Sequence, residues 1–197
     1  MSNFQFKANI TKEEINELPV RKFEGQVHII DNPDMLPEVA KRINGAKALG
    51  FDTETKPAFK KGQTNKIALL QLSTEKEVFL IRLQQTGIDN GLRDILASKS
   101  IKKIGVALHD DVKPLVALNR FEPNGFIDLQ KYVKDFGIED NGLKKLVANV
   151  LGFKISKRMQ TSNWEAPELT QQQIEYAATD AWVCLEIYNK LNELKNE

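Results

Sequence analysis

The chain has 197 residues, a length that favours one domain, and its 28 Lys and Arg residues nearly balance its 27 Asp and Glu residues. Hydrophobic residues make up 41% of the sequence and charged residues 28%, a balance that indicates a globular protein and excludes a disordered one. Because the net charge is near zero, any affinity for phosphate must come from local clusters of basic residues or from bound cations.

Cysteine and histidine are scarce. One cysteine, Cys184, excludes a disulfide framework, and two histidines are too few for a classical His/Cys zinc site. The first 15 residues contain no basic segment followed by an apolar one, which a secretory signal would have. No apolar run approaches the ~18 residues that a membrane-spanning helix needs. We therefore expect a reduced, soluble, cytoplasmic protein without a membrane partner.

Residues 1–24 are weakly patterned and are predicted to form an N-terminal extension, in which a capping box at residues 11–14 opens a short helix. From residue 25 to 197, strand-like and helix-like segments follow one another. Strands are predicted, in chain order, at residues 27–30, 48–51, 66–72, 78–81 and 103–108, with a short strand or turn at 126–129. Helices are predicted at residues 34–44, 91–98, 111–118, 130–136, 143–151 and after a capping box at 170–173.

The order of these elements predicts the fold class. The strands at 66–72 and 78–81 flank a short polar segment, which is typical of an antiparallel hairpin. Helices are predicted between most of the other strand-like segments, an order typical of an α/β domain. We expect an α/β domain over residues 25–197, with a mixed sheet flanked by helices on both faces.

Two carboxylates follow the apolar strand at 48–51. Asp52 and Glu54 are two residues apart, so in an extended strand both side chains point to the same side. Two like charges ~5 Å apart repel by roughly 3 kcal/mol at an effective dielectric of 20. Such a pair needs a cation, a proton or full solvation, and oxygen ligands favour Mg²⁺ or Mn²⁺. The alternative is an exposed turn whose charges face water.

A second carboxylate pattern lies in the last helix. Tyr176 and Asp180 are four residues apart and therefore share one helix face. Their small neighbours, among them Ala177 and Ala181, allow the helix to approach another element closely. A carboxylate on such a face needs a partner or a metal ion. The alternative is a capping or salt-bridging aspartate on an ordinary amphipathic helix.

A third pattern surrounds the paired aspartates 110 and 111. Asp111, Leu115 and Leu118 have i, i+4, i+7 spacing, which places Asp111 on the core-facing stripe of the helix. Asp110 suits the N-cap position and is predicted to be structural.

Together these segments resemble the DEDD superfamily of 3′→5′ exonucleases, in the tyrosine-containing DEDDy form of RNase D and Werner-syndrome-type exonuclease domains. Phe-Asp-Thr-Glu-Thr (51–55) is similar to the first motif, and Gly-Val-Ala-Leu-His-Asp-Asp (105–111) to the second. Gln-Ile-Glu-Tyr-Ala-Ala-Thr-Asp-Ala (173–181) resembles the third and is the most specific. Ser-Asn-Trp (162–164) also matches family members, and the resemblance covers about residues 25–192.

The resemblance implies an RNase H-like fold and a 3′→5′ exonuclease that acts on nucleic acid, single-stranded or 3′-recessed DNA or RNA, and releases nucleoside 5′-monophosphates. It also implies two Mg²⁺ (or Mn²⁺) ions as cofactors. The implied metal carboxylates are Asp52, Glu54, Asp111 and Asp180. Asp52 would bridge both ions, and Asp111 would support the second. Tyr176 would orient the attacking water.

Basic loops near these motifs are candidates for substrate contact. Lysines and arginines there could hold backbone phosphates, and aromatic rings could support the terminal base or a nearby loop. The predicted substrate-binding residues are Thr53, Phe59, Lys60, Lys61, Lys157, Arg158 and Trp164. The alternatives are solvated lysine loops and a core position for Trp164.

Three other functions are compatible with parts of this pattern. One is an exonuclease-fold protein that binds nucleic acid without cleaving it, although all four carboxylates are present. Another is an oligoribonuclease-like enzyme restricted to short oligonucleotides. A purely structural protein is disfavoured because nothing would then offset the clustered carboxylates.

Overall fold

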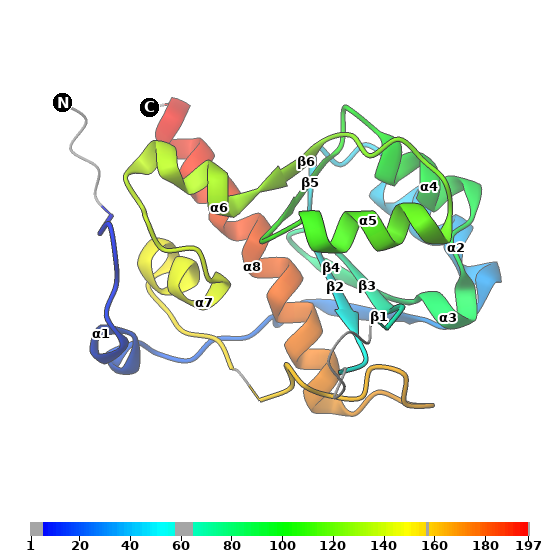
Figure 1. Ribbon diagram of the computed structural model, residues 1–197, viewed down its shortest axis with the longest axis horizontal. Helices are drawn as coiled ribbons and strands as arrows, with labels where there is room; N and C mark the ends of the chain where they lie inside the picture. The colour runs from blue at the N-terminus through cyan, green and yellow to red at the C-terminus, as the bar shows by residue number, and fades with distance from the viewer. Residues whose placement is uncertain (1–5, 58–64, 157, 197) are drawn as a thin grey trace.

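The computed structural model describes residues 6–57, 65–156 and 158–196, with the side chain of the last of these left out. Within these ranges, six strands form one sheet in the order β1-β4-β3-β2-β5-β6 (Figure 1). The strands are β1 (Gln26–Ile30), β2 (Ala48–Thr55), β3 (Ile67–Ser73), β4 (Glu77–Arg82), β5 (Lys102–Gly105) and β6 (Phe126–Asp128). β2, β3 and β4 pair antiparallel, whereas the other neighbours pair parallel. The predicted mixed sheet with its hairpin is confirmed.

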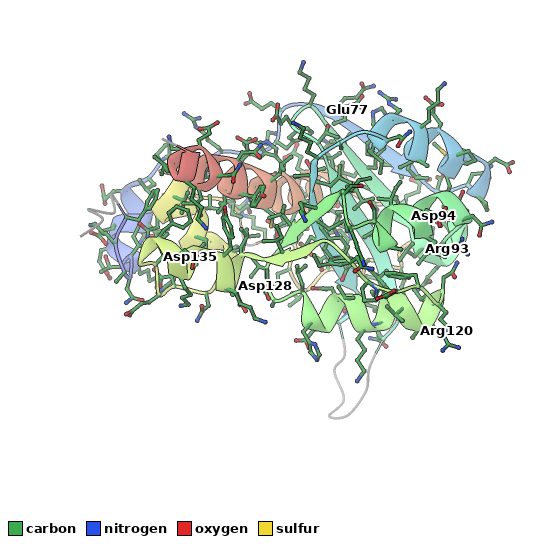
Figure 2. The ribbon with its side chains drawn as sticks, turned by 90° about the horizontal axis from the view of Figure 1, so that it is seen from above. Glu77, Arg93, Asp94, Arg120, Asp128 and Asp135 are labelled. Atoms are coloured by element: carbon green, nitrogen blue, oxygen red, sulfur yellow. The ribbon has the colours of Figure 1, made fainter. Side chains whose placement is uncertain are left out.

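Helices cover both faces of this sheet, as predicted. On one face, strand residues such as Phe51 and Leu70 share a core with α2 (Leu36–Ile43), α4 (Asn90–Ala97) and α5 (His109–Leu118). On the other face, Leu69 and Leu80 pack with Ala177 and Ala178 of α8 (Gln171–Asn196). Figure 2, seen from above, shows the sheet between α8 and α5. The reason is the strand alternation, which sends neighbouring residues to opposite faces.

The other helical elements are short. A 3₁₀ turn (Pro33–Met35) precedes α2, and α3 (Leu83–Thr86) follows β4. The helix predicted at 130–136 is divided into α6 (Leu129–Tyr132) and a 3₁₀ turn (Val133–Phe136), and the one at 143–151 passes from α7 (Leu143–Leu146) into a π-helical turn (Val147–Leu151). α6, α7 and the turns that follow them pack on α8 in a second core that contains Val183 and Ile187.

Two of the boundaries that differ from the prediction concern the site. β2 continues to Thr55, so Asp52 and Glu54 lie within the strand. β5 ends at Gly105, not at residue 108, because the chain turns at Ala107, which has a left-handed φ of 58°. Asp128, labelled in Figure 2, lies at the end of β6. Its side chain accepts from the Ala107 amide at 3.2 Å and holds this turn.

The predicted role of Asp110 as a helix N-cap is wrong. α5 begins at His109, its N-cap is Leu108, and no side chain caps it. Asp110 therefore lies inside the first turn, where its exposed carboxylate faces solvent beside the positive end of the helix dipole.

The N-terminal segment packs against the domain that follows it. α1 (Lys12–Glu17) begins with the predicted capping box between Thr11 and Glu14. Beyond it, the Lys154 amide donates to the Pro19 carbonyl at 2.8 Å, and Phe23 is buried against α8. Among the described residues, no helix has the length and apolar character required to cross a membrane.

Candidate metal centre and active site

Three carboxylates from two elements meet on the α8 face of the sheet. Asp52 and Glu54 leave β2 on the same side, and Asp180 faces them from α8. One oxygen of each carboxylate lies within 4.8 Å of the others. Among the described residues, these are the acidic side chains that lie close enough together to share a metal ion. The predicted convergence of these three residues is confirmed by their positions.

The three acidic groups hold their protons more tightly than usual. Burial raises the pKa of Asp52 well above its ordinary value, and the nearby Asp180 and Asp111 charges raise it further. Burial raises the pKa of Glu54 to about 9, and the charges of Asp52, Asp180 and Asp111 add to this shift. Burial also raises the pKa of Asp180 to about 7. A cluster with these properties favours a bound cation or a bound proton.

Asp111 lies beside this triad but not within it. Its carboxylate accepts a hydrogen bond from the hydroxyl of Thr53, which alternates with Asp52 and Glu54 and so points to the opposite face of β2. Burial raises the pKa of Asp111 to about 6, while this hydrogen bond lowers it. The charge of Asp111 still acts on Asp52 and Glu54. Thr53, predicted to contact substrate, is here the hydrogen-bond partner of Asp111.

Tyr176 lies one helical turn before Asp180 and is 8% exposed. Burial raises the pKa of its hydroxyl far above the ordinary value, and the charges of Asp180 and Glu54 add to the shift. The hydroxyl also forms a hydrogen-bonding interaction with Asp180, which lowers the pKa of that carboxyl. Tyr176 is therefore a neutral hydrogen-bond donor at the triad, and it cannot serve there as a base at neutral pH.

Trp164 is a core residue, so its predicted role beside a substrate base is not supported. Its side chain is 1% exposed, and its ring centre lies 6.0 Å from that of Tyr176. The loop that carries it is held by Arg82, whose guanidinium donates to the carbonyls of Ala166 and Pro167. Trp164 thus supports Tyr176 from behind instead of offering a surface on which a base could stack.

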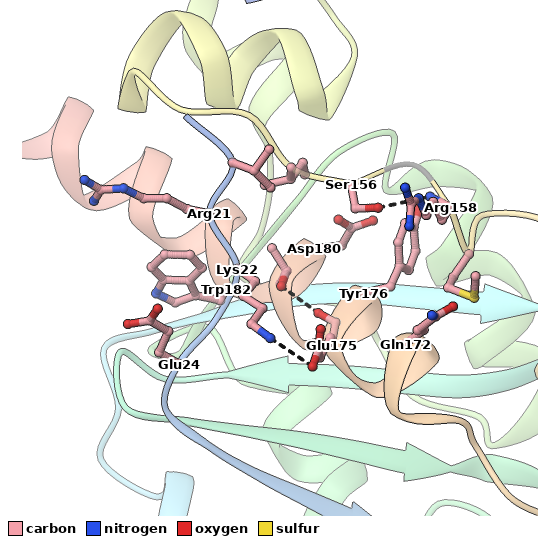
Figure 3. A pocket seen from close by; sticks show the side chains of 14 residues that line it. Arg21, Lys22, Glu24, Ser156, Arg158, Gln172, Glu175, Tyr176, Asp180 and Trp182 are labelled. Carbon is pink, nitrogen blue, oxygen red and sulfur yellow. Dashed lines mark hydrogen bonds and ion pairs between the residues drawn. The ribbon is translucent and has the colours of Figure 1, made fainter. Parts of the chain in front are cut away.

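A pocket of about 750 Å³ opens beside Tyr176 and Asp180 (Figure 3). Its walls come from residues 20–22 and 24, from residues 155, 156, 158 and 159, and from α8. Arg158, one of the predicted substrate-binding residues, lies on this wall, while Lys22 forms an ion pair with Glu175 at 2.9 Å. Participation of the segment around Lys22 was not predicted, because nothing local in residues 1–24 indicates which surface they cover.

Four other predicted substrate contacts lie outside the described residues, and their predictions stay untested: Phe59, Lys60, Lys61 and Lys157. Lys56, which precedes Phe59 in the sequence, forms an ion pair with Glu165 at 3.2 Å. The chain at Lys56 therefore lies against the segment that carries Trp164.

The residues present fit a divalent cation. The Oδ1 atom of Asp180 is buried and has no hydrogen-bond partner among the described residues. A buried carboxylate oxygen without a donor is costly unless a cation or a proton compensates it. All donors are carboxylate oxygens, the ligand type that Mg²⁺ and Mn²⁺ prefer. Gln71, a further polar side chain beside Asp52, was not predicted, although a glutamine within a strand that is otherwise almost wholly apolar could have indicated it.

The chain is similar to known nucleases along most of its length. A family model described as 3′-5′ exonuclease matches residues 27–195. The bifunctional 3′-5′ exonuclease/ATP-dependent helicase WRN of Mus musculus is 31% identical over 199 residues, which cover 95% of this chain and 14% of that protein. The exonuclease 3′-5′ domain-containing protein 2 of Drosophila melanogaster is 33% identical over 181 residues, covering 88% and 30%. The chain thus spans less than a third of either relative.

Solved structures have the same fold. RNase D of Escherichia coli, described as an exoribonuclease involved in structured RNA processing, superposes with a TM-score of 0.78 at 26% identity, over 87% of this chain and 45% of that one. The Nibbler EXO domain of Aedes aegypti superposes with a TM-score of 0.79 at 24% identity, over 89% and 93%. These likenesses confirm the expected RNase H-like fold. On the match to the family model and the identity to its relatives, the chain belongs to the 3′-5′ exonuclease family.

Proposed function

We propose that this chain hydrolyses nucleic acid from the 3′ end with two bound divalent cations, Mg²⁺ or Mn²⁺, and releases nucleoside 5′-monophosphates. The observation that carries this proposal is the convergence of Asp52, Glu54 and Asp180 within 4.8 Å. When bound, the cations supply an activated water and neutralise the charge that develops on the phosphate and the leaving oxygen.

Each residue of the site has a distinct role in this proposal. Asp52, central in the acidic group, would hold both cations, while Glu54 and Asp180 would complete the site for the one nearer the attacking water. Asp111, on the other side of β2, would hold the second cation, and Thr53 orients its carboxylate. The charge of Asp111 already raises the pKa of Asp52, so the two carboxylates are close enough to interact.

Tyr176 would orient the attacking water as a hydrogen-bond donor. Its raised pKa keeps the hydroxyl protonated at neutral pH, so it does not remove a proton from that water. Trp164 packs against the ring of Tyr176 and fixes its position. The side chain is thus positioned before substrate binds, which lowers the reorganisation needed during the reaction.

The substrate strand would approach along the surface that Arg158 lines. An arginine there suits a backbone phosphate, because its guanidinium donates two parallel hydrogen bonds to one anion. We propose single-stranded or 3′-recessed DNA or RNA as the substrate class.

The decisive experiment is digestion of 5′-labelled single-stranded DNA, single-stranded RNA and a 3′-recessed duplex in Mg²⁺, in Mn²⁺ and in EDTA. We expect a ladder that shortens from the 3′ end in either metal and no product in EDTA. Asp52→Ala and Asp180→Ala should each abolish the ladder, whereas Asp110→Asn, a change at the exposed neighbour of Asp111, should retain it. Full activity of the Asp52 or Asp180 variant in Mg²⁺ would exclude this mechanism.

Two further measurements separate the proposal from its alternatives. A wild-type protein that binds the labelled strands but releases no mononucleotide in either metal would be a binding module. Comparison of rates on 2-mers and 20-mers distinguishes a general exonuclease from an enzyme restricted to short oligonucleotides, since the latter loses its activity on the long strand.

A further inference from the structure

Gln71 is a fully buried polar side chain that the mechanism above does not use. It lies in the middle of β3, and its side chain is 0% exposed. Both atoms of its carboxamide, Nε2 and Oε1, are buried without a hydrogen-bond partner among the described residues. Two unpaired polar atoms at one buried position are unfavourable for folding, so the position of Gln71 calls for a functional reason.

The register of the sheet places Gln71 directly opposite Asp52. The two residues are partners in the antiparallel pair formed by β2 and β3. Directly opposite residues point to the same face, with Cβ atoms about 4.5–5.5 Å apart. The neighbouring pair on the same face behaves alike, because a Cβ placed on Gly50 would lie as close as 3.2 Å to that of its partner Ser73. The carboxamide of Gln71 and the carboxylate of Asp52 are therefore neighbours under α8.

The partner of Gln71 on its other side offers it no hydrogen bond. On the far side, its partner across the β3–β4 pair is Leu80, which is fully buried. Leu80 packs in one cluster with Ala177 and Ala178 of α8. Within this row of the sheet, the polar group that Gln71 can reach is the carboxylate of Asp52.

We propose that Gln71 is a positioning residue of the metal centre: when the cations bind, its Nε2, which has no partner among the described residues, would donate to the Asp52 carboxylate and hold it in the orientation that binds them. This inference rests on the proposed metal centre. A carboxylate that holds two cations must present its oxygens in one orientation, and a neighbouring donor fixes that orientation. Partners of this kind typically contribute about 10–100-fold to metal affinity or activity.

The test is the affinity for Mn²⁺, measured by isothermal titration calorimetry on wild type, Gln71→Met and Ser73→Ala. Methionine keeps the length of the side chain and removes both polar atoms. We expect the Mn²⁺ dissociation constant of Gln71→Met to rise about tenfold or more, while its thermal midpoint in EDTA equals or exceeds that of wild type. Ser73→Ala, a buried polar change on the same face of the same strand, should retain the wild-type dissociation constant.

Several outcomes would overturn the role of Gln71. A dissociation constant of Gln71→Met within twofold of wild type would do so, and so would an equal loss in Ser73→Ala. A lower midpoint in EDTA with unchanged Mn²⁺ affinity would show a merely structural role. Absence of Mn²⁺ binding by the wild type would overturn both the metal centre and this inference.

A measurement on the unaltered protein keeps the inference falsifiable even if Gln71→Met does not fold. The side-chain amide resonances of Gln71 can be followed by ¹⁵N NMR during titration with Mg²⁺. We expect them to shift and their hydrogen exchange to slow as the carboxamide becomes engaged. Resonances that remain unchanged while those of α8 respond to Mg²⁺ would contradict the proposal.

Discussion

Gly50 of β2 and Ala181 of α8 are in direct backbone contact, since a Cβ placed on Gly50 would lie 2.0 Å from the Ala181 carbonyl oxygen. This close approach also brings together Asp180, which precedes Ala181, and Asp52, which lies two positions after Gly50. We expect Gly50→Ala to force the helix away from the strand, at a cost of about 3 kcal/mol or more in the free energy of unfolding. Chemical denaturation measures the cost, and Mn²⁺ titration should show a weakened site.

Gly142→Ala is the matched control. Nothing lies within 4 Å of a Cβ at Gly142, and its backbone is extended. Its unfolding free energy should stay within about 0.5 kcal/mol of wild type. A Gly50→Ala variant as stable as this control, with unchanged metal affinity, would show that the contact does not position the site.

The free energy of unfolding should fall as pH rises. Carboxylates with lowered pKa values have the opposite effect. The pKa of Glu54 rises to about 9 and that of Asp180 to about 7, above their ordinary values near 4. The folded protein therefore keeps protons that the unfolded chain releases, and stability falls as pH rises from about 4 to about 9. In EDTA we expect a lower thermal midpoint at pH 8.5 than at pH 5.5.

Divalent cations should remove this dependence. Metal ligands bind in their deprotonated form, so added Mg²⁺ should raise the midpoint most at pH 8.5. Asp180→Asn, which removes one acidic group, should flatten the pH profile in EDTA. A midpoint that increases from pH 5.5 to 8.5 in EDTA would contradict the pKa shifts of the triad.

Tyr176→Phe should distinguish the role of the tyrosine hydroxyl in the reaction from the role of the ring in stability. The variant keeps the ring that packs on Trp164 but lacks the hydroxyl that interacts with Asp180. We expect kcat to fall about 100-fold with little change in thermal midpoint, as when one aligned donor is removed from an active site. Because the hydroxyl of Tyr176 stays protonated, the pH profile of the wild-type rate should contain no step from this tyrosine below pH ~10. A variant with full activity would remove Tyr176 from the mechanism.

Phe23 should be as important for stability as residues inside the predicted domain. It lies in the segment predicted to be an extension, yet it is 7% exposed, its ring centre lies 5.8 Å from that of Trp182, and its amide donates to the Thr179 hydroxyl at 3.1 Å. Phe23→Ala should lower the free energy of unfolding by about 3 kcal/mol. Val20→Ala, at a 66% exposed position of the same segment, should change it by less than about 0.5 kcal/mol. Equal stability of the two variants would show that this segment is dispensable.

Local patterns in the sequence were sufficient to predict most of the elements and the acidic motifs. The two-residue period of a strand places Asp52 and Glu54 on one side, and the helical period places Tyr176 and Asp180 on one face, whatever the rest of the chain does. Capping boxes at Thr11 and Thr170 likewise depend on residues three positions apart, and both occur in the structure.

Relationships between distant residues were decided only by the tertiary structure. The hydrogen bond from Thr53 to Asp111, the burial of Trp164 and the docking of Phe23 on α8 join elements that lie far apart in the chain. Their geometry depends on how closely α8 approaches β2 and on the register between β2 and β3, neither of which any short segment encodes. For the same reason the sequence alone predicts that Gln71 lies in a buried strand, but only the assembled sheet shows that Asp52 is its neighbour.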